Sequence, residues 1–495
     1  MMFLPALDRQ SDESLQKQIV RQMIEAISNG TLRSGEALSG VRDCASRWGV
    51  SRNTVVLALE RLEAEGYLET RPSRGTYVHR TPPHVGTRSP NASSASELGE
   101  TTRVMNPPRF LDRAFVGDND GFPPLKPSAS PLNLGFGSDV PLYRSMEWRR
   151  TVQRLLIRDN WKRGGQFQPN AGLPFLREAI ARWVTARHGL SIDAQQVIVI
   201  TGLQQAHSLV SRALLSPGMK VALEDPCYMG KRRLYETLGV TIVNAPVDGK
   251  GIRMAGLDLE DVSLVCVNPG CHVPTNVSLS LPRRRQLIAL AGQTKTHVFE
   301  ESMFDLLALE GKATPSLLTL SGGKNVLHAG LFAPALGGGV MLGYLIVPWA
   351  LLPAVIDAKL IMDNGLPWLE QEALARFIDA GDLDNLLKRN RTIMMRRRDY
   401  LLSAMKENLG EIAVLGAGHA PRLSWFLPPE FPDTASYVSR VKERNVYIPG
   451  EYPLRPSAAP PMPELDRLVS HGYGEVSDDE LEKVVQVFVQ SANLS

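Results

Sequence analysis

The stretch that identifies the fold of the larger part of this chain is Gly330-Leu331-Phe332-Ala333-Pro334-Ala335-Leu336-Gly337-Gly338-Gly339-Val340-Met341-Leu342-Gly343-Tyr344-Leu345. Its end opens the short apolar run 343–347, and comparable runs occupy 197–200, 221–223 and 263–267. Such runs are typical of strands buried on both faces, and here they alternate with amphipathic segments of helical periodicity. The alternation predicts an α/β domain with a mostly parallel sheet.

Composition divides the 495 residues into three regions. Residues 11–80 have apolar side chains at helical spacing, which predicts a small helical domain. Residues 81–131 are rich in Pro, Ser, Gly and Asn, the composition of a linker between two folding units. Residues 132–490 carry the strand and helix alternation. We therefore expect a multi-domain protein in which a linker separates a small domain from a large one.

The overall composition sets broad limits on function. A net charge of +3 over this length neither requires nor excludes nucleic acid, because a local basic surface is diluted in the sum. The four cysteines, Cys44, Cys227, Cys266 and Cys271, form no C-x-x-C pair, which favours a reducing compartment. The start of the chain lacks the pattern of a signal peptide, and no apolar run reaches the ~18 residues that span a bilayer. We expect a cytoplasmic protein with no membrane partner.

The small domain shows the pattern of a winged helix-turn-helix. An apolar stripe predicts a first helix that stops at Asn29-Gly30, and a second helix is expected over 41–48. Ser51 is a suitable cap for a third helix, and residues 66–78 indicate a β-hairpin with glycine near its tip. Three helices followed by a hairpin predict an α+β DNA-binding domain.

Two segments carry a family resemblance: Gly49-Val50-Ser51-Arg52-Asn53-Thr54-Val55 and Leu62-Glu63-Ala64-Glu65-Gly66-Tyr67-Leu68. They resemble the GntR family of bacterial regulators, and the similarity extends over about residues 15–78. In that family the start of the third helix enters the major groove. The resemblance therefore places Arg52, Asn53 and Thr54 at base edges and phosphates of double-stranded DNA.

The same resemblance implies DNA contacts from two other places. Arg42 opens the second helix, and Arg74 with Gly75 forms the wing tip. Arginine suits such positions because its planar fork bonds guanine edges or phosphate oxygens in two places. The alternative, a merely solvated basic face, is weaker for three arginines at matched positions than for one. Where the family usually has Pro-Ser before Arg42, this chain has Ser39-Gly40, so we expect an altered contact there.

The large domain resembles aminotransferase fold type I along its whole length. The segments that carry this resemblance are Ala171-Gly172-Leu173-Pro174-Phe175, Thr201-Gly202-Leu203-Gln204-Gln205 and Glu224-Asp225-Pro226-Cys227-Tyr228. The fold implies a large, mostly parallel sheet and a smaller C-terminal α+β subdomain. A GntR-type winged helix joined to this fold is the arrangement of MocR-type regulators. Because fold-type I domains pair, the resemblance also implies a homodimer that binds repeated half-sites.

Five positions decide whether the fold can use pyridoxal phosphate. The enzymes need a Schiff-base lysine, an acid on the pyridine nitrogen, a tyrosine near the ring oxygen, a phosphate-binding arginine and a carboxylate-binding arginine. Alignment of motifs puts these at Pro334, Glu301, Met303, Met341 and Ser470 respectively. Proline has no amine that could condense with an aldehyde, so no internal aldimine can form at residue 334. We expect no catalytic residue and no covalent cofactor.

The remaining frame of the pocket is explained by fold maintenance. It consists of Tyr228, where an aromatic side chain stacks on the ring, and of residues 201–205 near the phosphate. Pyridoxal phosphate bound without a covalent link would lack both its anchor and its main anion partner. Two residues could substitute for the missing groups, and neither is favoured: Lys324, which we expect on the surface, and Arg467, three residues from Ser470. A metal site at Cys266, Cys271 and His272 is not favoured either, because the spacing fits no familiar zinc pattern.

These features lead to one main hypothesis and two alternatives. The main hypothesis is a DNA-binding regulator of MocR type whose aminotransferase-like domain is catalytically inactive and serves dimerisation and the sensing of an unidentified small molecule. The first alternative is a pyridoxal-phosphate-binding regulator or aminotransferase that uses a non-standard lysine. The second is a scaffold whose pocket is filled or collapsed.

Overall fold

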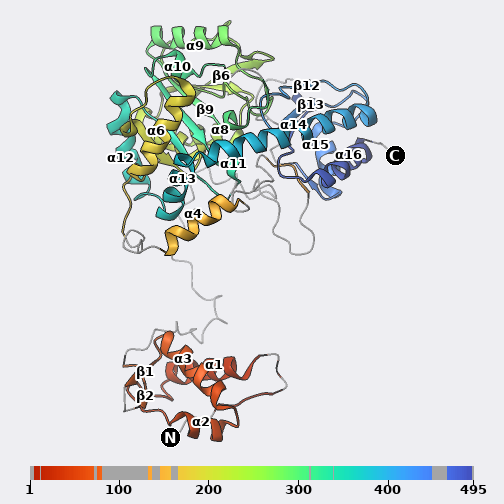
Figure 1. Cartoon of the computed structure of the whole chain (residues 1–495). Helices are drawn as coiled ribbons and strands as arrows, with labels where there is room; N and C mark the ends of the chain where they lie inside the picture. The colour runs from red at the N-terminus through yellow and green to blue at the C-terminus, as the bar shows by residue number, and fades with distance from the viewer. Residues whose placement is uncertain are drawn as a thin grey trace, which may run out of the picture. The chain divides into compact units, whose positions relative to one another are not determined.

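The computed structural model describes residues 5–9, 11, 13–71, 75–80, 132–135, 145–157, 166–310, 314–337, 339–448 and 465–492. The chain divides into two compact units, Met1–Asn106 and Pro107–Ser495 (Figure 1). The predicted linker 81–131 and the predicted contact Arg74 lie outside the described residues. Within the described ranges, no helix is long and apolar enough to cross a membrane.

The N-terminal unit is the predicted winged helix-turn-helix. Its elements are α1 (Leu15–Ser28), α2 (Val41–Trp48), α3 (Arg52–Ala64), β1 (Leu68–Arg71) and β2 (Gly75–Val78). The two strands pair antiparallel. Gly49 ends α2 in the left-handed conformation with φ 65°, which glycine adopts without a steric penalty. This residue lets the chain turn directly from α2 into α3.

A sheet of eight strands forms the centre of the large unit, in the order β4-β11-β10-β9-β8-β5-β6-β7. The strands are β4 (Val197–Ile200), β5 (Lys220–Asp225), β6 (Thr241–Asp248), β7 (Gly251–Ile252), β8 (Val262–Val267), β9 (His297–Ser302), β10 (Val326–Leu331) and β11 (Gly343–Ile346). Neighbours from β10 through β6 run parallel, while β11 and β7 run antiparallel to theirs. The predicted mostly parallel sheet is confirmed.

Helices cover both faces of this sheet, which explains the apolar runs seen in the sequence. In β4, Val197 and Val199 face a core shared with α6, α9, α10 and α13, whereas Ile198 and Ile200 face a second core shared with α7, α8 and α12. The first group of helices comprises α6 (Pro174–His188), α9 (Leu281–Thr294), α10 (Leu317–Leu320) and α13 (Trp368–Asp379). The second comprises α7 (Leu203–Leu214), α8 (Met229–Thr237) and α12 (Leu352–Met362). Because both faces of such a strand are buried, its sequence is a continuous apolar run and does not alternate between apolar and polar residues.

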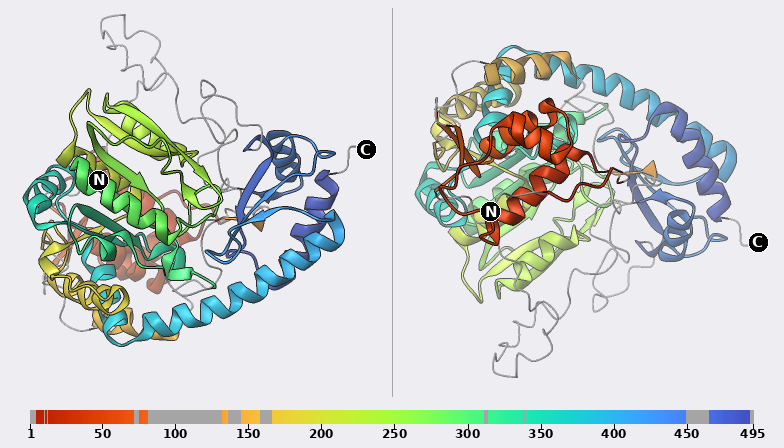
Figure 2. Two further views of the ribbon diagram at one scale, coloured as in Figure 1. Left: turned by 90° about the horizontal axis from the view of Figure 1, so that it is seen from above. Right: turned by 90° about the horizontal axis from the view of Figure 1, so that it is seen from below.

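A smaller C-terminal subdomain completes the large unit. Its antiparallel sheet has the order β12-β13-β15, and its elements are β12 (Val414–Leu415), β13 (Arg422–Phe426), α15 (Thr434–Glu443), β14 (Val446–Tyr447), β15 (Leu468–Gly472) and α16 (Asp478–Ala492). β14 pairs with β3 (Leu132–Asn133). Figure 2 shows the long helix α14 (Asp382–Leu409) running from the large sheet to this subdomain.

The remaining short elements connect these layers. They are α4 (Met146–Ile157), α11 (Ala333–Leu336) and the 3-10 helices η3 (Ala194–Gln196), η4 (Asp305–Leu307), η5 (Trp349–Leu351) and η6 (Leu465–Arg467). The single turn α11 contains Pro334 and begins directly after β10. It therefore lies at the carboxyl end of the parallel strands, where α/β proteins build their sites.

Candidate functional sites

The first candidate site is the start of α3 in the winged helix. Ser51 caps the helix: its hydroxyl accepts a hydrogen bond from the Thr54 amide at 3.1 Å and bonds the Thr54 hydroxyl at 2.8 Å. Arg52 and Asn53 follow and are exposed, while Thr54 is half-buried. The cap fixes the first turn, so the two exposed side chains project from a defined backbone.

The other predicted DNA contacts of this unit lie outside α3. Arg42, in the first turn of α2, is exposed. Gly75 begins β2 with φ 101°, a conformation that other residues rarely adopt, so glycine is required at this point of the wing. Arg74, its neighbour, belongs to the undescribed residues.

Arginines of the winged helix divide into two groups by their partners. Four form ion pairs with carboxylates on the unit's own surface: Arg21 with Glu13 and Glu25, Arg47 with Asp43, Arg61 with Glu65, and Arg71 with Glu69. Arg42 and Arg52 have no such partner among the described residues of the unit. Their charge is left for an external anion.

The second candidate site is at the carboxyl ends of the large unit's parallel strands. Glu301 lies near the end of β9, Asn268 directly follows β8, and Tyr228 lies between β5 and α8. Thr201 follows β4, and Pro334 follows β10. Residues far apart in the sequence thus share one edge of the sheet.

Glu301 is the centre of a buried polar cluster. Its Oε1 accepts a hydrogen bond from Lys231 Nζ at 2.6 Å and lies 3.4 Å from His207 Nε2. Its Oε2 accepts a hydrogen bond from Asn268 Nδ2 at 3.1 Å. Burial would raise the pKa of Glu301, but Lys231 and His207 outweigh it and lower the pKa to about 2. Glu301 is therefore ionised and already balanced by groups of this chain.

Lys231, in the first turn of α8, supplies the balancing charge. Only 2% of its surface is exposed. Burial by itself would lower its pKa, yet the Glu301 carboxylate raises the pKa above the ordinary lysine value. Lys231 is therefore a protonated ammonium group, which has no lone pair with which to attack an aldehyde.

A third acid, Glu224, lies beside this pair. Its Oε2 accepts a hydrogen bond from the backbone N–H of Asn268 at 3.0 Å and lies 3.9 Å from His272 Nε2. Burial raises the pKa of Glu224 to about 8, against the lowering effect of Lys231. The cluster thus holds one ammonium, one carboxylate and one neutral carboxylic acid at neutral pH.

Contacts within the chain also occupy the loop predicted to be near a phosphate. The Thr201 amide donates to Gln205 Oε1 at 2.8 Å, and the Gln205 amide group donates to Asp363. Lys359, which is fully buried, donates to the same carboxylate. Met341 is 55% exposed and reaches the loop near Gly202. A thioether cannot neutralise a phosphate.

The positions predicted for the ring and the substrate carboxylate are also placed. Pro334 is buried in α11, Met303 is half-buried, and Tyr228 is 56% exposed. Ser470 is buried on β15 and contacts a residue not predicted from the sequence: Arg422 Nη2 of the adjacent strand donates to Ser470 Oγ at 2.7 Å.

The substitutes considered from the sequence do not reach the pocket. Lys324 is exposed, as predicted. Arg467 donates to the carbonyl oxygens of Leu427 and Phe431 and so stabilises a loop of the C-terminal subdomain. The buried lysine of this pocket is instead Lys231, which sequence reasoning missed. Its position three residues after Tyr228, at the start of a helix, is the only local signal for it.

The cysteines and His272 make separate contacts. His272 Nδ1 bonds Thr275 Oγ1 at 2.7 Å, Cys266 Sγ lies 3.2 Å from Tyr235 Oη, and Cys271 Sγ lies 3.6 Å from Asn276 Oδ1. In the part of the chain that the structure describes, no group of three His, Cys, Asp or Glu side chains is arranged to hold a metal ion.

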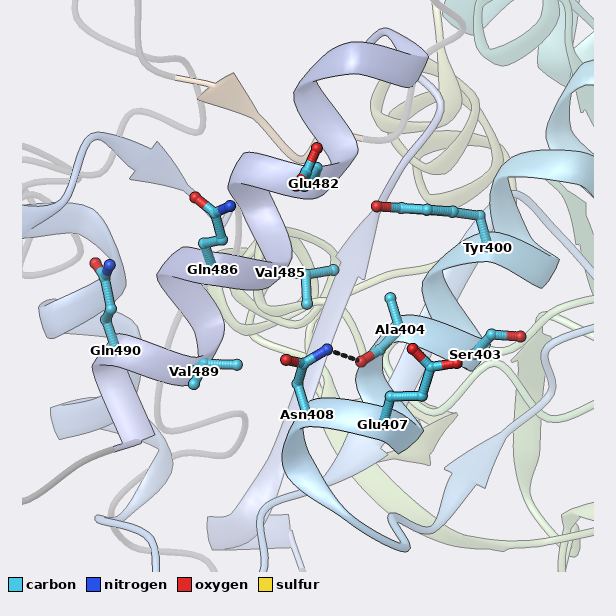
Figure 3. A pocket seen from close by; sticks show the side chains of 10 residues that line it. All are labelled: Tyr400, Ser403, Ala404, Glu407, Asn408, Glu482, Val485, Gln486, Val489 and Gln490. Carbon is cyan, nitrogen blue, oxygen red and sulfur yellow. Dashed lines mark hydrogen bonds between the residues drawn. The ribbon is translucent and has the colours of Figure 1, made fainter.

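A groove lies between α14 and α16 of the large unit (Figure 3). It is lined by Tyr400, Ser403, Ala404, Glu407, Asn408, Glu482, Val485, Gln486, Val489 and Gln490. None of these lining side chains is cationic. The groove therefore offers hydroxyl and amide donors, but no cation, to the phosphate or carboxylate group of a ligand.

A winged helix-turn-helix on the same chain as an aminotransferase fold defines a two-domain class of DNA-binding regulators. Residues 134–459 match the family of aminotransferase class I and II, and residues 15–78 match the bacterial regulatory proteins of the gntR family. The chain belongs to the aminotransferase class I and II family through its large unit. With its GntR domain, it is a regulator of the MocR type.

Bacterial transcriptional regulators are similar to this chain over most of their length. The chain is 29% identical to the HTH-type transcriptional regulator TauR of Rhodobacter capsulatus, over 88% of each protein. It is 27% identical to the probable rhizopine catabolism regulatory protein MocR of Rhizobium meliloti, over 82% of this chain and 80% of that one. An archaeal alanine:glyoxylate aminotransferase has a TM-score of 0.67 at 21% identity, over 74% of this chain and 91% of that chain, which shows the fold alone.

Pyridoxal phosphate is the cofactor implied by this fold, and the residues of the pocket do not fit it. The motif resemblance predicts Pro334 at the Schiff-base position and Met341 at the phosphate position. The acid that would pair with the pyridine nitrogen, Glu301, is already bonded to the Lys231 ammonium group. A pyridinium ring would have to share that carboxylate with the Lys231 ammonium group.

Proposed function

We propose that this transcriptional regulator binds operator DNA through its winged helix, while its large unit performs no aldimine chemistry. The large unit would instead hold two chains together and respond to a small molecule other than covalently bound pyridoxal phosphate. The observation that carries the proposal is the Lys231–Glu301 pair, buried where the cofactor ring would lie, together with Pro334. We assign the DNA-binding domain to 11–80, the linker to 81–131 and the large domain to 132–490, in a cytoplasmic protein.

The DNA-binding part of the proposal places the start of α3 in the major groove. Arg52 and Asn53 would read base edges there, with Thr54 supporting the first turn. Arg42 and the wing tip, Arg74 with Gly75, would contact the phosphates on either side. Support comes from the absence of an intramolecular ion-pair partner for Arg42 and Arg52 within the described residues.

The proposal that the large unit is catalytically inactive rests on the protonation and the ion pairs of its buried lysines. A Schiff base requires a neutral amine, and Lys231 is held protonated by Glu301. Lys359 is also buried and bonded to a carboxylate, that of Asp363. The other candidate function, a pyridoxal-phosphate protein with a non-standard lysine, would need one of these pairs to break.

The dimeric part of the proposal rests on exposed apolar side chains of the large unit. Leu156 and Ile157 at the end of α4 are 63% and 80% exposed, and Ile361 on α12 is 79% exposed. Large apolar side chains are favoured at surfaces that another protein covers. A twofold dimer would present two winged helices to repeated half-sites.

The decisive experiment is a titration of the purified full chain with pyridoxal phosphate, followed by borohydride reduction and mass analysis. We expect no internal-aldimine absorption band near ~420 nm, since an aldimine requires a free lysine amine, and no reduced adduct. A stoichiometric adduct on Lys231 or Lys359 would overturn the proposal in favour of the non-standard lysine. Light scattering of the same sample tests the dimer.

A further inference from the structure

A short segment before α1 is fastened along that helix by two glutamines. The Ala6 amide donates to Gln22 Oε1 at 2.7 Å, and Gln22 Nε2 donates back to the Ala6 carbonyl at 2.6 Å. Gln18 makes the same pair of bonds with Asp8, at 2.9 and 2.8 Å. We call residues 5–9 the strap.

The spacing explains why this arrangement is stable. Glutamines four apart on a helix are separated by about 6 Å along its axis, and residues two apart in an extended chain by about 6.6 Å. Each glutamine side chain can therefore accept a hydrogen bond from the backbone N–H of one strap residue and donate one to the carbonyl of the same residue. Leu7, between the two bonded residues, packs against the core of the winged helix. Gln18 is itself buried.

The strap delivers one cationic side chain to the turn before α3. Arg9 is exposed, and its Nη2 donates to the carbonyl of Gly49 at 2.6 Å. Gly49 is the left-handed residue that ends α2, two residues before the Ser51 cap. A carbonyl is a neutral acceptor, and among the described residues no carboxylate forms an ion pair with Arg9. Its charge is positioned but not neutralised.

We propose that Arg9 is a further DNA contact of this protein and that it binds a backbone phosphate beside the groove that α3 enters. The inference rests on the proposed placement of α3. One N–H of the guanidinium holds the turn, and the remaining four donors are left for an anion. Phosphate, not a base edge, is the partner because Arg9 flanks the turn instead of extending from the face of α3. The strap thus acts as a small arm that adds a fixed charge to the interface.

The alternative role for Arg9 is purely structural, a hydrogen bond that holds the strap to the turn. Arg9→Gln separates the two roles, because the glutamine amide still has a donor for the Gly49 carbonyl but carries no charge. Arg21→Gln is the matched control: it removes the same charge from the same unit, at an arginine already paired with Glu13 and Glu25.

The test measures how the affinity for DNA depends on salt. An operator duplex is first selected from a random-sequence pool with the unmodified full chain, and binding is then followed by fluorescence anisotropy over a range of salt concentrations. A lost phosphate contact lowers the slope of log affinity against log salt by about 0.9 per bound protomer. We expect that reduction for Arg9→Gln, little change for Arg21→Gln, and recovery of the slope for Arg9→Lys.

Two results would decide against this role. An unchanged slope in Arg9→Gln would overturn it, and so would an equal reduction in Arg21→Gln, because only net charge would then matter. If the slope were unchanged and the melting temperature of the winged helix fell in Arg9→Gln, Arg9 would have only the structural role of holding the strap to the turn. Arg52→Ala distinguishes this inference from the proposed function, because it should remove sequence preference, whereas Arg9→Gln should weaken all duplexes alike.

Discussion

The winged helix and the cofactor pocket differ in whether their charged side chains are neutralised within the chain. On the winged helix, Arg42, Arg52 and Arg9 are exposed, and no described carboxylate neutralises them. In the pocket, Glu301 and Lys231 are buried and neutralise one another. A charge left unbalanced on a surface is available to a partner, whereas a balanced buried pair is not. The contrast supports the proposal that the protein binds DNA through its winged helix and performs no aldimine chemistry in its large unit.

The largest effect should come from breaking the buried pair. Lys231→Met leaves the buried Glu301 carboxylate without its balancing cation, and removing one partner of a buried pair typically costs about 3–5 kcal/mol. We expect a strong fall in the melting temperature of the large unit. Adding Glu301→Leu should recover much of it, because an apolar pair of similar volume avoids the uncompensated charge.

The control for this variant is Lys406→Met, which removes an exposed lysine paired with Glu411. Exposed pairs of this kind are screened by solvent and contribute little to stability, so its melting temperature should stay close to that of the unmodified chain. If Lys231→Met melted like the control, the pair would not hold the pocket together, and the contrast between the two regions would fail.

The next effect concerns the other side of the comparison, DNA recognition. Arg52→Ala should remove site-specific binding, because each lost bidentate base contact costs about 1–3 kcal/mol and a dimer loses two. The dimer itself should persist. Arg61→Ala, on the same helix but paired with Glu65, should bind the operator normally. Anisotropy with the selected duplex and with a scrambled one measures both affinity and sequence preference. Unchanged affinity in Arg52→Ala would contradict the placement of α3 in the major groove.

These expectations show which parts of the protein its sequence reveals. The winged helix and the large sheet were predicted because each depends on local patterns, such as Gly49 between two helices or the apolar run of β4. The proline at position 334 could also be read from the sequence, because a substitution at a single position of a motif needs no knowledge of distant contacts. Lys231 was not, because it meets Glu301 across 70 residues of chain and no spacing rule joins a helix start to a strand end. Arg422 reaches Ser470 in the same way, across 48 residues.

A pH-dependent effect should follow from the titration of Glu224. Its folded pKa of about 8 lies above the ordinary value of 4.5, so its contribution to stability is fully present below pH 4.5 and is lost as the pH rises through 8. Groups that face it include Lys231, Glu301 and His272. Glu224→Gln cannot ionise, so its melting temperature relative to the unmodified chain should increase steadily from pH 5 to pH 8.

The measurement compares both proteins by calorimetry in buffers of equal ionic strength. Only the difference between them matters, because buried histidines act in the other direction: the folded pKa of His272 is lowered to about 3 by burial, so its contribution is lost on acidification below its ordinary value of 6.5. A difference that stays constant over this pH range would mean that Glu224 is ionised in the folded state.

The smallest effect separates stability from recognition within the winged helix. Ser51→Ala and Ser14→Ala each remove a helix cap, of α3 and of α1 respectively, at a typical cost of about 1 kcal/mol. That cost corresponds to a fall of about 4–8 °C in the melting temperature of a domain of this size. Only Ser51 orders the turn that carries Arg52 and Asn53. Ser51→Ala should therefore also weaken operator binding at temperatures where both variants are folded, whereas Ser14→Ala should not. Equal affinities in the two variants would show that the first turn of α3 is ordered by the DNA and not by its cap.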